Sequence, residues 1–395
     1  MKYFYLFLAC LLAQPLLAQK KLPIIKATSS NVSIRDGQFL DKDAWTLAPE
    51  AKPDIFTADR TRKPKWVVFY TDIDSIRIKV KPNTSFDFMV LLNNKDTCYT
   101  RVLSAISENK AAKKAENRQD TIPFCLTTYD AIHVKALVNQ RDSLNLHFDL
   151  GAFDVRLTQA AILKKTQLLA HQPDALAGKA KPNFNNMQKV SSLTMGTLTL
   201  TEPAFSSTMQ TAQEMDGRFG WNVFEGKIVE MDYDKNLLIV HTKLPKKAKK
   251  YAAMDLTFLR SFPCIKGELS AKNKKYEGYF IMDTGSNKAM MIDSTWAAKL
   301  AFPQDLPLLK FASFQNPRGV VFQSKIVACP QFNIQTFSME NVPTTLLGSQ
   351  NPTNFEVNLL GNDVLKRFNM ILDFKHDRIY LQPNHLMKKP FKEAS

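Results

Sequence analysis

Two aspartates, Asp149 and Asp283, stand in matching surroundings along the chain. Each ends an apolar stretch and opens an Asp-x-Gly sequence, in which the glycine permits a sharp turn and lets a second backbone approach closely. Two carboxyl groups held a few ångströms apart cannot both ionise, so they share one proton. The ionised member of such a pair can take a proton from a bound water while the protonated member donates a hydrogen bond. We therefore expect Asp149 and Asp283 to form one site whose titration belongs to the pair.

The elements that must position these aspartates recur in the same order in two copies. Each copy has an apolar strand with Asp-x-Gly, then an apolar-Gly turn leading into a short helix, then a hairpin. These segments are 146–152, 219–225 and 228–240 in the first copy, and 280–286, 359–367 and 370–381 in the second. The repeat predicts two similar lobes packed together, with residues 121–245 in lobe 1 and residues 246–395 in lobe 2.

The second copy resembles the signature of aspartic peptidases of the pepsin and retropepsin type. The matching residues are Phe280-Ile281-Met282-Asp283-Thr284-Gly285-Ser286, with Leu359-Leu360-Gly361 downstream. The duplicated arrangement resembles the single-chain, two-lobed form of exported bacterial relatives, over residues 121–385. The resemblance implies a mainly β fold with two acid-protease lobes around a cleft. It also implies hydrolysis of peptide bonds in peptide or protein substrates, by water activated between two carboxylates, with no cofactor and no metal.

The resemblance assigns roles to the residues that follow each aspartate. Thr284 is expected to hydrogen-bond across to the opposite loop, and Gly285 to let the two loops meet. Gly151 and Ser286 are expected to complete the supporting loops. The first copy departs from the family, because Leu150 stands where a threonine is expected and cannot supply the reciprocal hydroxyl bond.

The segments that would cover the site are less well marked. The chain has no tyrosine between Tyr129 and Tyr233, so lobe 1 lacks the flap tyrosine of pepsin-like enzymes. The candidate flaps are hairpins at 187–200 and at 311–325, the second with residues 316–319 at its tip. We expect His147 to be structural, on the argument that neighbouring residues of a strand face opposite ways. Trp221 and Phe224 are expected in the core.

The amino-terminal part of the chain predicts export and a separate domain. Residues 1–19 have a positive start, an apolar run at 4–12 and small residues before the cleavage point, as in a secretory signal peptide. Cys10 offers a lipidation site as an alternative. We expect a periplasmic or extracellular protein with a small antiparallel β domain at 20–107 and a charged linker at 108–120.

Charge and cysteine content exclude several classes of site. The chain has 53 Lys+Arg and 37 Asp+Glu among 395 residues, a net charge of +16. Its basic runs lack interleaved aromatic residues, which favours solvated loops over a nucleic-acid surface. No segment after the leader reaches the length of ~20 apolar residues that a membrane-spanning helix needs. The remaining cysteines, in no zinc pattern, could form two disulfides or stay as buried thiols; they are Cys98, Cys125, Cys264 and Cys329.

Three hypotheses follow from these patterns. The first is an exported aspartic endopeptidase that acts as a monomer, with activity that Leu150 could weaken. The second is a non-catalytic relative that binds peptides in the same cleft. The third is a symmetric site made by lobe 2 of two chains, although lobe 1 already offers a partner surface. Retention of both Asp149 and Asp283 favours the enzyme.

Overall fold

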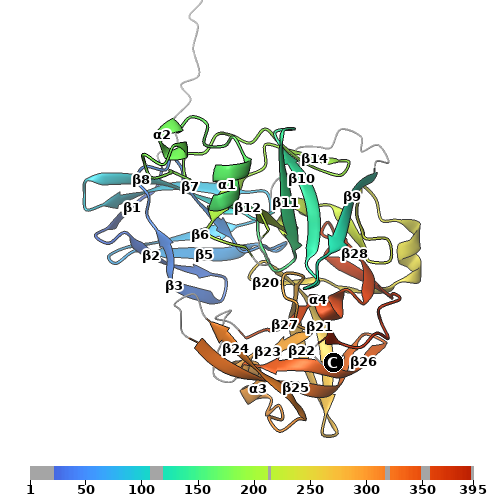
Figure 1. Ribbon diagram of the computed structural model, residues 1–395. Helices are drawn as coiled ribbons and strands as arrows, with labels where there is room; N and C mark the ends of the chain where they lie inside the picture. The colour runs from blue at the N-terminus through green and yellow to red at the C-terminus, as the bar shows by residue number, and fades with distance from the viewer. Residues whose placement is uncertain (1–21, 107–118, 212–214, 316–320, 348–355, 393–395) are drawn as a thin grey trace, which may run out of the picture. The chain divides into compact units, whose positions relative to one another are not determined.

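The computed structural model describes residues 22–106, 119–211, 215–315, 321–347 and 356–392 of the chain. The chain divides into two compact units, residues 1–108 and 109–395. The structure is mainly β, as predicted (Figure 1). The predicted signal peptide at 1–19 and residues 108–118 of the predicted linker lie outside the described residues.

The first unit consists of two four-stranded sheets with one core between them. One sheet has the order β1 (Ile24–Ala27), β7 (Ser85–Leu92), β8 (Asp96–Ser104) and β4 (Asp54–Ala58). The other has the order β3 (Phe39–Thr46), β2 (Asn31–Asp36), β5 (Lys65–Tyr70) and β6 (Ser75–Val80). Phe69 and Phe88, one from each sheet, meet edge to face with their centroids 5.3 Å apart. The alternation of apolar and polar residues therefore buries one face of each sheet.

The prediction of a purely antiparallel amino-terminal domain is wrong for two strand pairs. β1 runs parallel to β7, and β4 runs parallel to β8. In the chain, β4 lies between strands of the other sheet, so its neighbour is set by long-range packing and not by a hairpin. Alternation in the sequence carries no information on strand direction.

The strands of the second unit follow the predicted repeat. Its first half contains β9 (Gln119–Leu126), β10 (Ile132–Val138), β11 (Asp142–Asp149), β12 (Val155–Thr158), β13 (Ser192–Met195), β14 (Leu198–Thr201), β15 (Phe205–Thr208), β16 (Gly217–Gly220), β17 (Ile228–Asp232) and β18 (Leu237–His241). Its second half contains β19 (Ala252–Asp255), β20 (Thr257–Leu259), β21 (Phe262–Ala271), β22 (Lys274–Asp283), β23 (Met290–Ile292), β24 (Leu308–Gln315), β25 (Val321–Ile334), β26 (Phe337–Leu346), β27 (Asn358–Gly361), β28 (Phe368–Asp373) and β29 (Arg378–Pro383).

Short helices follow the expected glycine turns. η2 (Trp221–Phe224) is a 3-10 turn after β16, and α4 (Asn362–Leu365) follows β27. The remaining helical segments are α1 (Gln159–Lys165), α2 (Pro173–Leu176), η3 (Lys246–Lys250) and α3 (Ser294–Lys299). Thr158 and Asp293 cap α1 and α3 by accepting from backbone N–H groups of their first turns.

The two copies are joined by a shared sheet. The hairpins β17–β18 and β28–β29, both predicted, pair through β17 and β28, with Ile228 opposite Asp373 and Met231 opposite Met370. β9 extends this sheet on one side and β19 on the other. β28 is buried along its whole length, as befits a central strand covered on both faces.

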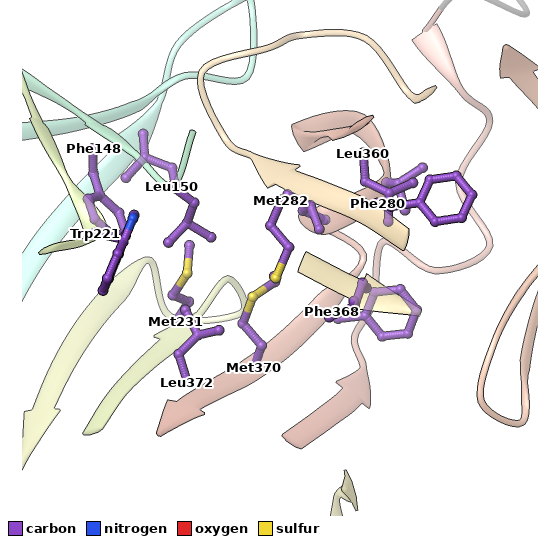
Figure 2. Packing of buried hydrophobic residues seen from close by; sticks show 14 of the residues in the cluster. Phe148, Leu150, Trp221, Met231, Phe280, Met282, Leu360, Phe368, Met370 and Leu372 are labelled. Carbon is purple, nitrogen blue, oxygen red and sulfur yellow. The ribbon is translucent and has the colours of Figure 1, made fainter. Parts of the chain in front are cut away.

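One hydrophobic core spans both copies. Figure 2 shows Leu150 beside Met231, and Met282 facing Met370. Trp221 and Phe224 are 2% and 0% exposed, which confirms their prediction as core residues. The core therefore fixes the ends of β11 and β22, from which the two aspartates project.

The four cysteines among the described residues are free, so the two-disulfide alternative is wrong. Cys98, Cys264 and Cys329 are buried, whereas Cys125 is exposed. Within the described ranges, none of the helices has the length and apolar character needed to cross a membrane.

Candidate active site

Asp149 and Asp283 end two strands that are built alike. Asp149 is the last residue of β11 and lies opposite Gly220 of the parallel strand β16. Asp283 is the last residue of β22 and lies opposite Gly361 of the parallel strand β27. The two carboxyl groups approach the same point, because a Cβ atom built on Gly151 would lie 2.9 Å from Asp283 Oδ1 and 3.2 Å from Asp149 Oδ1. A single protein chain therefore brings together the two aspartates that the sequence predicts as a pair, and no second chain is needed.

Backbone amides of the two turns hold the carboxyl groups. Gly151 N–H donates to Asp149 Oδ1 at 2.8 Å. Gly285 and Ser286 donate their N–H groups to Asp283 Oδ1 at 2.9 and 3.1 Å. These donors fix the orientation of each carboxyl relative to its own turn, as expected for Asp-x-Gly loops that present a carboxylate.

The two glycines leave room for the opposite carboxyl. A Cβ atom on Gly285 would lie 2.6 Å from Asp149 Oδ2, and one on Gly151 would lie 2.9 Å from Asp283 Cγ. Real Cβ atoms do not approach other heavy atoms so closely, so a larger residue at either position would push the carboxyls apart. The requirement for glycine here is close approach, as the sequence predicts.

Thr284 links the two loops by its side chain. Its hydroxyl accepts from Leu150 N–H at 3.0 Å and donates to the Phe148 carbonyl at 3.1 Å. Thr284 is 1% exposed and Leu150 is fully buried. The leucine side chain packs in the core and has no hydroxyl with which to return these bonds. The structure therefore has one half of a reciprocal clamp.

The electrostatic environment of the two carboxyls is unequal. Burial, followed by the neighbouring Asp149 carboxylate, raises the pKa of Asp283 well above its ordinary value. Asp149 instead faces a cation, because Arg218 Nη1 lies 3.7 Å from Asp149 Oδ2. Burial and the neighbouring carboxylate therefore favour the protonated form of Asp283, whereas Arg218 is a cation beside Asp149.

His147 does not face away from Asp149, so that part of the expectation is wrong. The two residues are two positions apart, and residues at this spacing in a strand share a face. His147 is 2% exposed, and its Nε2 lies 3.4 Å from the Thr284 carbonyl oxygen. Burial lowers the pKa of His147, although the Asp149 carboxylate acts in the opposite direction. The buried imidazole of His147 therefore contacts the backbone of the loop that follows Asp283.

Arg218 is the site residue that the sequence reasoning missed. In the first copy His147 lies opposite Arg218, and in the second copy Ile281 lies opposite Leu359, at the same distance before the aspartate. A polar pair thus replaces an apolar pair. Comparing the two copies position by position would have shown this difference.

Both segments predicted as flaps form hairpins, but only the first has its tip among the described residues. β13 and β14 form a hairpin within the segment expected in lobe 1. Its tip is held on β9, because Thr197 N–H donates to the Thr121 carbonyl at 3.0 Å and Thr121 N–H donates to Thr197 Oγ1 at 2.9 Å. This hairpin is therefore anchored to the sheet and is not a free flap. β24 and β25 form the second expected hairpin, whose tip at 316–320 lies outside the described residues.

Groups of three or more His, Cys, Asp or Glu that could hold a metal ion are absent from the described part of the chain. The groups that contact the two carboxyls include the Arg218 guanidinium and the backbone amides of the two turns. The chain matches no protein-family model, and it has no match among curated proteins.

Proposed function

We propose that this protein is an aspartic endopeptidase of the two-lobed type, in which Asp149 and Asp283 activate a water molecule for hydrolysis of a peptide bond. The observation that carries the proposal is the close approach of the two carboxyl groups, each presented by its own Asp-x-Gly turn and each within 3.2 Å of a Cβ atom built on Gly151. A solitary aspartate at a strand end is commonly a turn residue. Two that share a proton are suited to acid–base catalysis.

The unequal surroundings assign a role to each carboxyl. Asp149, with its charge favoured by Arg218 at 3.7 Å, takes a proton from the water as its oxygen bonds to the substrate carbonyl carbon. Asp283 holds the dyad proton because its pKa is raised, and it donates a hydrogen bond to the substrate carbonyl oxygen. The proton on Asp149 then passes to the leaving nitrogen as the carbon–nitrogen bond breaks.

A second candidate function rests on Leu150. Because the leucine is fully buried and returns no hydroxyl bond, the dyad is clamped from one side only. A dyad held less rigidly would bind peptides and turn them over slowly or not at all. The alternative is therefore a peptide-binding module with the same site.

The test is cleavage of a mixed peptide pool, followed by mass spectrometry from acidic to neutral pH. The wild type should cleave, and Asp283→Asn and Asp149→Asn should each abolish cleavage, because an amide cannot share the dyad proton. Asp305→Asn is the matched control, since Asp305 is an exposed aspartate that forms an ion pair with Lys272. If Asp283→Asn cleaves as fast as the wild type, the enzyme proposal fails. If the wild type is inert but binds peptides with micromolar affinity, the binding module replaces it.

A second pair of variants tests the half clamp. Leu150→Thr should preserve or raise the rate of cleavage, because a hydroxyl there can return the bonds that Thr284 makes to the opposite loop. Valine has the same shape as threonine but no hydroxyl, so Leu150→Val should cleave more slowly than Leu150→Thr. If the two variants have equal rates, the missing hydroxyl does not limit the dyad.

A further inference from the structure

Three polar side chains meet on the solvent-facing side of β9, β10 and β11, apart from the carboxyl dyad. Cys125 Sγ lies 3.2 Å from His133 Nδ1, and His133 Nε2 lies 2.9 Å from Asn145 Oδ1. A thiol, an imidazole and an amide are thus joined in series, each contributed by a different strand.

The strand register brings these residues together. Cys125 lies directly opposite His133 in the β9–β10 pair. Asn145 is on β11, diagonal to His133, whose direct partner there is His147. The intervening residues of each strand, such as Phe124, Val134 and Leu146, are buried on the other face. The alternation of the strands therefore places the three polar residues on one side of the sheet.

The hydrogen bonds determine which ring nitrogen carries the proton. An amide oxygen can only accept, so the contact with Asn145 Oδ1 requires a proton on His133 Nε2. In a neutral imidazole the other nitrogen, Nδ1, is then an acceptor, and it faces the Cys125 thiol. The thiol therefore has an acceptor for its proton within hydrogen-bond reach.

The backbone holds the amide in place. Asn145 N–H donates to Asp216 Oδ2 at 2.9 Å, and Asp216 N–H donates to the Asn145 carbonyl at 2.9 Å. Lys165 Nζ pairs with the other carboxylate oxygen of Asp216 at 2.7 Å. A side chain whose own backbone is bonded twice is a fixed reference for the orientation of the His133 ring.

Cys125 differs from the other described cysteines in access and surroundings. Cys98, Cys264 and Cys329 are 0% exposed. Burial raises the pKa of the Cys98 thiol, raises that of Cys264 to about 12 and raises that of Cys329 to about 11. Buried thiols with raised pKa values form little thiolate at neutral pH, so we expect these three to react slowly. The three buried cysteines therefore serve as internal controls for the exposed Cys125.

We propose that Cys125 is a reactive thiol and a site of covalent modification by low-molecular-weight disulfides, with His133 as its proton acceptor and Asn145 as the residue that positions the ring. The thiol proton moves to His133 Nδ1, and the sulfur attacks one sulfur of the disulfide. A bond forms between Cys125 and that sulfur as the reagent's own sulfur–sulfur bond breaks. The released thiolate takes the proton from the imidazolium, so the exchange is balanced without a further oxidant.

Two further titratable groups lie beside His133 in the described sheet. His147 lies opposite His133 on β11, and Lys135 is the next residue of β10 on the same face. The remaining cysteines of the second unit, Cys264 and Cys329, are buried and cannot attack a mixed disulfide on the surface. The modification therefore persists until a thiol from solution reverses it.

The test is the rate at which the folded protein releases thiolate from an aromatic disulfide whose product absorbs visible light. Near neutral pH one thiol should react rapidly, and peptide mapping should locate the label at Cys125. His133→Gln should slow this phase by about three- to tenfold, because the thiol loses its proton acceptor. Asn145→Ala should slow it less. At alkaline pH, where any exposed thiol ionises without help, the variants and the wild type should converge.

Two controls separate chemistry from structure. Cys125→Ser should remove the rapid phase, and His171→Gln should leave it unchanged, since His171 is an exposed histidine elsewhere in the unit. The wild type alone gives a further measurement if a variant does not fold: near neutral pH Cys125 should react faster in the native protein than in the unfolded chain. The proposal is overturned by a slower native reaction, by a label at another cysteine, or by His133→Gln reacting as fast as the wild type near neutral pH. These readouts do not depend on peptidase activity.

Discussion

Thr284 supplies the side-chain hydroxyl that joins the two Asp-x-Gly loops, and this makes the loops unequal. Its two hydrogen bonds run to the backbone of Leu150 and of Phe148. The opposite loop offers only apolar surface at the corresponding position. The geometry of the dyad therefore depends more on the second copy than on the first, which agrees with the better match of the second copy to the motif.

We expect Thr284→Val to lower the free energy of unfolding by about 1–3 kcal/mol, because it leaves a buried N–H and a buried carbonyl unpaired. Thr345→Val is the matched control. Thr345 is also 0% exposed, but its hydroxyl has no hydrogen-bond partner in the described structure, so its removal should be neutral or stabilising. Urea unfolding of both variants measures the difference. Equal losses would mean that the cross-loop bonds contribute nothing beyond burial.

The raised pKa of Asp283 predicts a pH dependence of stability. The folded protein binds this proton more tightly than the unfolded chain does. The resulting stabilisation is complete below the ordinary pKa of an aspartate and is lost as the pH rises through the raised value. The Asp283→Asn variant has no proton to lose at this position. Its free energy of unfolding should therefore rise relative to that of the wild type as the pH goes from acidic to neutral.

Urea unfolding at several pH values measures this gain, and Asp305→Asn provides a control of opposite sign. Lys272 lowers the pKa of Asp305 by a hydrogen bond between the side chains. That contribution is present above the ordinary pKa of an aspartate and is lost as the pH falls. At neutral pH Asp305→Asn should therefore have a lower free energy of unfolding than the wild type. The difference should be small, because the ion pair is exposed and screened by solvent. Parallel curves for the wild type and Asp283→Asn would contradict the assignment of the dyad proton.

Among the elements, the pairing of β17 with β28 makes one sheet from the hairpins of both copies. Met370 of β28 lies opposite Met231 of the first copy and is 0% exposed, and Figure 2 shows it facing Met282 near the end of β22, in its own copy. The side chains at this junction connect the shared sheet to the strands that carry the aspartates. Packing here should therefore affect both halves of the dyad.

We expect Met370→Ala to lower the free energy of unfolding by about 2–5 kcal/mol, through the lost contacts and the cavity left behind. Met209→Ala removes the same side chain from a position that is 77% exposed, so its effect should stay within about 0.5 kcal/mol. Denaturant titration of both variants measures the contrast. A small effect at Met370 would show that the junction collapses around the change and is not tightly packed.

The local part of this architecture could be predicted from the sequence, because it is written in neighbouring residues. Alternating apolar residues and turn residues were enough to predict the strand before Asp149, the strand before Asp283 and both terminal hairpins. The pairing of β17 with β28 could not be predicted, because strands in register across two copies leave no short-range signal. The parallel strands of the first unit escaped prediction for the same reason.

Some residues of the two sites could likewise be predicted from the sequence, and others could not. Asp283, Thr284, Gly285 and Ser286 follow one another in the chain, so the motif identifies them together. Arg218 reaches Asp149 only because β16 lies beside β11, and Cys125 reaches His133 only through the register of β9 and β10. Residues that become neighbours through strand pairing are hidden until the pairing is known. In a β protein, partners that strand pairing brings together are therefore the hardest to predict from one sequence.

For the whole molecule, the division into two units has a thermodynamic consequence. The first unit encloses its own core, in which Phe69 meets both Phe56 and Phe88 with centroids 5.3 Å apart. The core of the second unit has no residue in common with it. Each unit therefore has the apolar burial that a separate cooperative transition requires.

Calorimetry of the full chain should resolve two unfolding transitions, and core substitutions should assign them. Phe69→Ala should destabilise the first unit by about 3–5 kcal/mol and lower the midpoint of one transition, because it removes a fully buried ring. Met370→Ala should lower the other. Phe86→Ala, which removes a ring that is 37% exposed from the same unit as Phe69, should shift the first transition much less than Phe69→Ala does. If Phe69→Ala and Met370→Ala both move a single transition, the two cores unfold together, and the units act as one cooperative structure despite their separate cores.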